Sequence, residues 1–150
     1  MEAQQDFKKL LELFNAHNVE YVIVGAYALA FHGAPRYTGD LDLLIKPEEE
    51  NAQKVISALK DFGFASLGLS INDFSAPEKV IQLGVPPVRI DIITSITGVT
   101  WEQVTSNRES GTYGNIPVYY IGKKEFIANK KAISRYKDLA DIEALGEKTD

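Results

Sequence analysis

Two aspartates separated by a single residue are the strongest chemical signal in the sequence. Asp40 and Asp42 lie in the run Asp40–Ile45, which is otherwise built from Leu and Ile and predicts a strand. Successive side chains on a strand point to opposite faces, so both carboxylates share one face, roughly 6–7 Å apart. Carboxylate oxygen is the ligand that Mg²⁺ prefers, and two close acids repel unless a cation neutralises them. The pair therefore indicates a divalent-metal site, or else one acid caps the turn after Gly39 and the other faces solvent.

A third acid occurs in a second apolar run, residues 88–93, which also predicts a strand. In this run Asp91 and Arg89 share one face, and Ile90 and Ile92 share the other. A carboxylate among such residues is costly to bury unless it is paired or binds a metal. Asp91 is therefore a candidate third metal ligand, with an ion pair to Arg89 or Arg36 as the alternative.

A glycine follows the first predicted strand directly. Residues 21–24 are apolar and rich in β-branched side chains, and Gly25 comes next, before a short predicted helix over residues 26–31. Backbone N–H groups at the start of a helix bind phosphate well, and a glycine allows a phosphate to approach the backbone. We therefore expect a phosphate-binding turn at Gly25, one helix and one loop before the paired acids.

The remaining patterns place these residues in a mixed framework of helices and strands. Helical spacing of apolar side chains predicts a helix over residues 2–17. Residues 62–77 give weak signals, which we interpret as a strand or a loop. Further helices are expected at 47–61, 101–104, 124–133 and 137–145, and further strands at 80–83 and 118–121, the last following a tight turn at 113–116. This order predicts an α+β (α/β) fold, a small mixed β-sheet flanked by helices, in a single domain spanning residues 1–150.

Composition limits the classes of protein that remain. The chain has no cysteine, which excludes disulfides and thiolate metal sites, and no apolar run long enough to span a membrane. We expect a cytoplasmic protein. The net charge of −5 argues against a protein that coats nucleic acid through a broad basic face. A local basic cluster, which could also be a solvated helix face, occurs near the C-terminus: Lys123, Lys124, Lys130, Lys131, Arg135 and Lys137.

Taken together, these motifs resemble the DNA polymerase beta-like nucleotidyltransferase superfamily. The matching residues are Gly25-Ala26 after a strand, Asp40-Leu41-Asp42 on the next strand, and Asp91 on a later one. Residues 24–45 look closest to the bacterial branch that includes AbiEii-type toxins and related stand-alone domains. The C-terminal element of that branch is matched by Glu125, Asn129-Lys130, Arg135 and the segment 137–141.

The resemblance implies a nucleotidyltransferase fold and a role for each motif. Asp40, Asp42 and Asp91 would be the catalytic and metal-binding acids, and Mg²⁺ or Mn²⁺ the cofactor of a bound nucleoside triphosphate. The implied nucleotide-binding residues are Gly25, Ala26, Lys130, Arg135 and Lys137, and further candidates are Arg36, Thr38 and Asp138. Ala26 departs from the superfamily pattern, which usually has Ser or Gly there, so a hydroxyl that would help hold the triphosphate is lost.

Three functions are compatible with this sequence. The first is transfer of a nucleoside monophosphate to a hydroxyl of RNA, a protein or a small molecule. The second is a catalytically weak or inactive domain that binds a nucleotide or a protein partner, such as the cognate antitoxin-type partner of a toxin–antitoxin pair. The third is an antibiotic-modifying enzyme; such enzymes usually carry an extra substrate-binding domain, for which 150 residues leave little room, so a homodimer would have to supply it.

Overall fold

A computed structural model describes residues 3–85 and 87–148. The first half of the chain alternates helices and strands, as expected. Its elements are α1 (Gln5–Ala16), β1 (Tyr21–Val24), α2 (Gly25–Phe31), β2 (Asp40–Ile45) and α3 (Glu49–Phe62). The predicted helix over residues 2–17 thus begins later, and residue 2 lies outside the described part of the chain. In the same way, the helix expected from residue 47 begins at Glu49.

The second half of the chain corrects one prediction. Residues 62–77, interpreted as a strand or a loop, contain a 3₁₀ turn (Ala65–Leu67) and the short helix α4 (Ile71–Ser75). A capping box between Ser70 and Asp73 starts α4, and Phe74 anchors it in the core. The elements that follow are β3 (Val80–Val85), β4 (Val88–Ile93), α5 (Trp101–Ser106), β5 (Glu109–Tyr113), β6 (Ile116–Tyr120), α6 (Lys123–Ile133) and α7 (Tyr136–Ala144).

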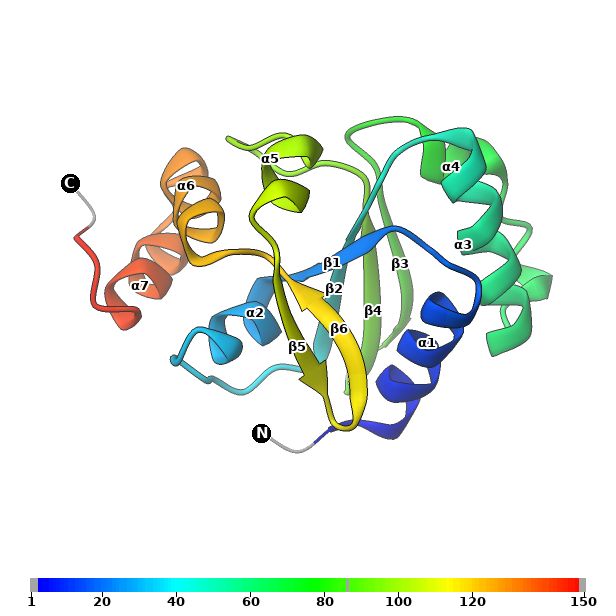
Figure 1. The fold of residues 1–150 in the computed structure, drawn as a ribbon, viewed down its shortest axis with the longest axis horizontal. Helices are drawn as coiled ribbons and strands as arrows, with labels where there is room; N and C mark the ends of the chain where they lie inside the picture. Colours follow the sequence, from blue (N-terminus) through cyan, green and yellow to red (C-terminus); the bar gives the residue numbers. More distant parts are fainter. Residues whose placement is uncertain (1–2, 86, 149–150) are drawn as a thin grey trace.

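The six strands form one mixed sheet in the order β3-β4-β2-β1-β6-β5. Strand β2 is antiparallel to β1 and parallel to β4, so the two acid-bearing strands are neighbours at the centre of the sheet. Figure 1 shows α1, α3 and α4 to one side of the sheet, and α2, α6 and α7 to the other. This arrangement confirms the predicted α+β fold with a mixed sheet flanked by helices.

The hydrophobic core fixes which face of β2 carries the acids. Leu41 and Leu43 are fully buried in the core cluster, together with the apolar face of α1. Because side chains alternate along a strand, Asp40 and Asp42 point to the opposite face of the sheet. That face lies toward α2 and the α6–α7 pair in Figure 1. No helix in the described part of the chain is long and apolar enough to cross a membrane.

Candidate active site

Sheet register brings two of the three predicted acids directly opposite each other. In the parallel pairing of β2 with β4, Asp42 is the register partner of Asp91. Asp40 lies two residues before Asp42 on the same strand face, and Asp91 is 6% exposed. The three carboxylates therefore come from adjacent strands and occupy one end of the same sheet face.

Gly25 lies directly against the Asp42 carboxylate. Val24, the last residue of β1, is paired with Asp42, so the chain enters α2 beside this acid. Gly25 has φ +70°, and a Cβ there would overlap the Asp42 carboxylate, lying 3.0 Å from its Cγ. Glycine is thus required twice, for the left-handed backbone and for the close approach. The predicted turn is formed, and it borders the acids.

Burial and like charge change the protonation of this acid pair. Burial raises the pKa of Asp42 to about 7, and the neighbouring Asp91 carboxylate adds to the rise through its negative charge and a shared hydrogen bond. The negative charge of Asp40 acts in the same direction, and the positive charge of Lys130 opposes it. Near neutral pH the Asp42–Asp91 pair is therefore poised to lose a proton when a cation approaches.

Arg89 already neutralises part of the acidic cluster. Its Nη2 and Nε donate to the two oxygens of Asp91 at 2.9 and 3.1 Å, and Nε lies 3.7 Å from Asp40. This contact with Asp91 raises the pKa of the guanidinium. The ion pair between Arg89 and Asp91 is the alternative that the sequence left open, and it is present. Within residues 3–85 and 87–148, no three His, Asp or Glu side chains are grouped closely enough to hold a metal ion.

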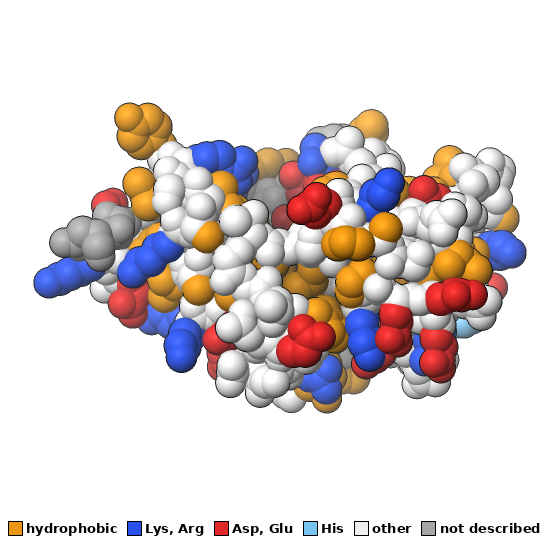
Figure 2. All heavy atoms as spheres, turned by 90° about the horizontal axis from the view of Figure 1, so that it is seen from above, with side chains coloured by type: hydrophobic (Ala, Val, Ile, Leu, Met, Phe, Trp, Pro, Cys, Tyr) orange, Lys and Arg blue, Asp and Glu red, His pale blue; other side chains and the backbone are white. Residues whose placement is uncertain are grey.

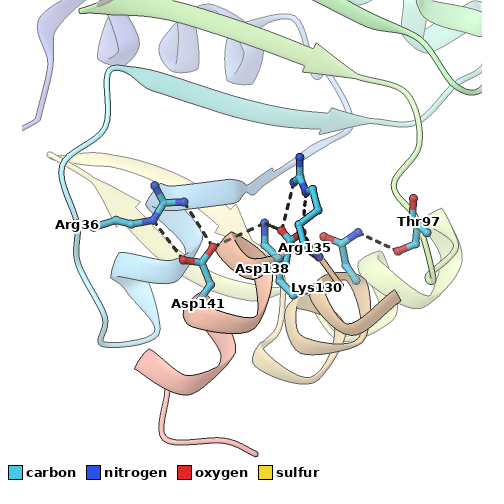
Figure 3. A network of polar contacts seen from close by, with 7 residues as sticks. Arg36, Thr97, Lys130, Arg135, Asp138 and Asp141 are labelled. Carbon is cyan, nitrogen blue, oxygen red and sulfur yellow. Dashed lines mark hydrogen bonds and ion pairs between the residues drawn. The ribbon is translucent and has the colours of Figure 1, made fainter. Parts of the chain in front are cut away.

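The C-terminal helices bring a buried cation to the acids. Lys130 on α6 is 8% exposed, and its positive charge acts to lower the pKa of Asp42, against the larger effect of burial. Its Nζ lies 3.4 Å from Asp138 and 3.9 Å from Asp141, both on α7. Arg135 donates to Asp138 at 2.7 Å, and this hydrogen bond holds the pKa of Asp138 below its usual range. Figure 3 shows these side chains converging between the two helices.

The other predicted residues divide into those near the acids and those away from them. Arg36 reaches Asp141 from the loop before β2, and the Thr38 hydroxyl accepts a hydrogen bond from the Asp40 backbone N–H at 3.0 Å. Ala26 is buried in the first turn of α2. Lys137 is exposed, and the structure brings it to none of these groups.

Asp141 belongs to the C-terminal segment 137–141 of the resemblance, where the sequence favoured a helix-surface or capping acid over a site residue. The sequence gives little reason to choose it, because an acid four residues before the end of a helix usually faces solvent. The basic cluster that was predicted near the C-terminus surrounds this region. Figure 2 shows Lys and Arg side chains spread over the end of the molecule formed by α6 and α7.

Solved structures share this architecture. The antibiotic-resistance factor ANT(2'')-Ia superposes with a TM-score of 0.62 over 94% of this chain and 80% of its own, at 12% identity. The lincosamide antibiotic adenylyltransferase LnuA, bound to lincomycin, superposes with a TM-score of 0.58 over 97% of both chains, at 16% identity. This chain has the nucleotidyltransferase fold. A proposed nucleotidyltransferase from Thermotoga maritima matches it as well, with a TM-score of 0.55, 16% identity, and 93% and 85% of the two chains covered.

These similarities confirm the nucleotidyltransferase fold and leave the finer assignment open. No protein-family model matches the sequence, and a comparison with curated proteins finds no match. The three structures are an antibiotic-resistance factor, an antibiotic adenylyltransferase and a proposed nucleotidyltransferase, so they do not test the AbiEii assignment. Kinship to the AbiEii branch therefore stays a prediction.

Proposed function

We propose that this protein is a divalent-metal-dependent nucleotidyltransferase that moves a nucleoside monophosphate from a triphosphate to a hydroxyl acceptor. One observation carries the proposal: Asp42 and Asp91 lie opposite each other on neighbouring strands, Gly25 is packed against Asp42, and the positive charge of the buried Lys130 opposes the rise in the Asp42 pKa. Carboxylates, a glycine turn and a buried cation are the groups that a metal-bound triphosphate requires. All four come from different elements and meet at one end of the sheet.

The donor set fits Mg²⁺ or Mn²⁺. Its oxygens are hard ligands, and the pKa of Asp42 is raised first by burial and then by the negative charges of Asp91 and Asp40, which a divalent ion would neutralise. Asp42 and Asp91 would hold the ion. Asp40, which is 35% exposed and lies 3.7 Å from Arg89, would have to turn toward the pair to join them, because the three carboxylates are not grouped closely enough as they stand. Arg89 bonds to Asp91 in this structure. The partly exposed Arg89 side chain would therefore have to move away from that carboxylate before the metal could bind. When bound, the metal would neutralise phosphate charge and stabilise the attacking and leaving oxygens of an in-line displacement.

The chain's own residues would perform the remaining tasks. Phosphoryl-type transfer depends on positioning and charge neutralisation, so few further groups are needed. The backbone at Gly25 and Ala26 would donate to phosphate oxygens, and Lys130 would neutralise a non-bridging oxygen. Asp91, freed from Arg89, would accept the proton of the acceptor hydroxyl. Arg36 and Arg135 are additional phosphate contacts in this scheme, and Lys137, an exposed side chain at the start of α7, is a further candidate.

Among acceptors, a small molecule is the class to test first. The length of the chain leaves little room for the extra substrate-binding domain that antibiotic-modifying enzymes usually carry, unless a second subunit supplies it. LnuA, described as a lincosamide adenylyltransferase, matches 97% of this chain over 97% of its own length. Chain length is therefore no argument against a small-molecule acceptor here. RNA and protein acceptors, including a partner of the antitoxin type, are the other classes to be tested.

A transfer assay tests the proposal directly. Purified protein with α-labelled triphosphates and Mg²⁺ or Mn²⁺ would be offered hydroxylated antibiotics, total RNA and whole-cell protein in parallel. We expect label to enter one acceptor class, and Asp42→Asn to abolish it. Glu12→Gln, which removes an exposed acid from α1, is the matched control and should retain activity. If the wild-type protein binds a triphosphate with metal but transfers its nucleoside monophosphate to none of these acceptors, the domain is a nucleotide-binding module instead.

A further inference from the structure

Helix α7 carries two buried aspartates that the hydrophobic core does not require. Asp138 and Asp141 are 0% and 5% exposed and lie about one turn apart. Buried carboxylates are costly unless they are paired, and both of these meet cations. The cations come from three different segments: Arg36 before β2, Lys130 on α6, and Arg135 at the start of α7.

The two aspartates differ in what they hold. Asp138 accepts hydrogen bonds from the backbone N–H of Arg135 at 3.1 Å and from its Nε at 2.7 Å, which completes a capping box for α7. Its loss would therefore disturb the helix itself. Asp141 lies inside α7 and caps nothing, and its polar contacts are with Arg36 and Lys130. Asp141 can thus be altered without removing the helix cap.

The position of Asp141 links two cations that serve the site in different ways. On one side is Lys130 of α6, which is buried and lies 3.9 Å from the Asp141 carboxylate. On the other is Arg36, which lies four residues before Asp40 on the loop that leads into β2. Figure 3 shows Asp141 between these two side chains. The carboxylate therefore connects the C-terminal helices to the segment that carries the acids.

The lengths of these contacts leave the cations available to a ligand. Asp141 lies 3.4 Å from Nε of Arg36 and 3.9 Å from Nζ of Lys130, longer than the ~2.7–2.9 Å of a strong charge-assisted hydrogen bond. Arg36 also keeps 39% of its side chain exposed. Both cations can therefore turn toward a phosphate while the carboxylate keeps them from repelling each other.

We infer that Asp141 is a positioning residue of the nucleotide site, holding Lys130 and Arg36 side by side so that both meet the phosphates of a bound triphosphate. The inference rests on the proposed function. Asp141 itself touches neither the nucleotide nor the metal. By charge alone, removing an acid near a phosphate should strengthen binding, whereas loss of a positioning contact should weaken it. A purely electrostatic role and a positioning role therefore predict opposite changes in the Kd of the triphosphate when the acid is removed.

The test compares Asp141→Asn with wild type. Asparagine keeps the shape and hydrogen-bonding capacity and removes the charge. We expect Kd for a nonhydrolysable triphosphate, measured by calorimetry with Mg²⁺, to rise about tenfold, as for weakened charge-assisted contacts. KM should rise by a similar factor with kcat little changed. Asp141→Glu should recover part of the affinity, and Glu143→Gln, on the exposed side of α7, should leave Kd at the wild-type value.

A second variant covers a folding failure and checks the route of the effect. Arg36→Gln removes the guanidinium that contacts Asp141. Because Arg36 lies exposed on a loop, this variant should fold, and it should also raise Kd. In that background, the Asp141→Asn change should have less effect than in wild type, because the two residues act together. The positioning role is overturned if Asp141→Asn binds the triphosphate as tightly as wild type or more tightly. It is also overturned if the effects of Asp141→Asn and Arg36→Gln on the binding free energy add fully. Either result leaves the proposed function standing. Wild-type protein that binds no triphosphate overturns the proposed function as well.

Discussion

Replacing Asp42 by asparagine should stabilise the metal-free protein at alkaline pH. Burial and the Asp91 charge raise the pKa of Asp42 from 3.8 to about 7. The folded state thus binds this proton more tightly than the unfolded chain does. The free energy of unfolding therefore falls as the pH rises through the interval from 3.8 to about 7, and it falls no further, on account of this group, above that. Asparagine has no charge to bury and escapes this loss.

The magnitude follows from the size of the shift. The change from 3.8 to about 7 is about three pKa units at about 1.4 kcal/mol each, which sets a ceiling of about 4 kcal/mol for ionising the pair. For a chain of this length, 1 kcal/mol corresponds to roughly 2–4 °C in Tm. We expect Tm of Asp42→Asn to exceed that of wild type by roughly 5–10 °C at about pH 8 and by less than half of that at about pH 5, where only the first part of the interval has been crossed.

Thermal unfolding followed by fluorescence, with a chelator present, measures this difference at both pH values. Asp40→Asn is the matched control, because that side chain is 35% exposed and its charge is solvated. It should show no comparable gain. A variant Asp42→Asn that is less stable than wild type at about pH 8, or that differs from it equally at both pH values, would refute the electrostatic reasoning.

Three further predictions concern the groups around the acids. Gly25→Ala should lower Tm and abolish stabilisation by Mg²⁺, because its Cβ displaces the adjacent carboxylate; Gly63→Ala, with φ +118° and no atom within 4 Å, should keep the Mg²⁺ response. Arg89→Gln should lower Tm in chelator, yet show a larger Tm increase on adding Mg²⁺ than wild type, because the cation no longer competes for Asp91. Asp138→Ala should destabilise by about 2–4 kcal/mol in urea unfolding, since it removes the nearer of two carboxylates from a buried lysine and also removes a helix cap.

Local patterns in the sequence predicted the central part of the fold. Alternation along residues 40–45 placed two acids on one strand face and two leucines on the other, and the structure has this arrangement. The strand–glycine–helix turn at Gly25 was also predicted, mainly because the paired acids follow it one helix and one loop later, and the structure adds its left-handed backbone. The short helix α4 was missed because five residues carry too little periodicity to identify a helix.

Long-range pairing was beyond the sequence. That Asp42 faces Asp91 depends on the register between β2 and β4, which the hydrophobic pattern of either strand alone does not specify. Both Arg89 and Arg36 were possible partners for Asp91, and only the fold shows that Arg89 takes it while Arg36 reaches Asp141. Segment 137–141 was matched to the C-terminal element of the resemblance, but the contacts of Asp141 with Arg36 and Lys130 arise from the packing of α7 against α6, which the sequence does not specify.

A crystal structure with Mn²⁺ and a nonhydrolysable triphosphate tests the central claim most directly. We predict an anomalous peak bridging Asp42 and Asp91, triphosphate oxygens beside the backbone of Gly25, and the Arg89 guanidinium moved away from Asp91. Manganese bound elsewhere, with Arg89 still bonded to Asp91 at full triphosphate occupancy, would contradict the account.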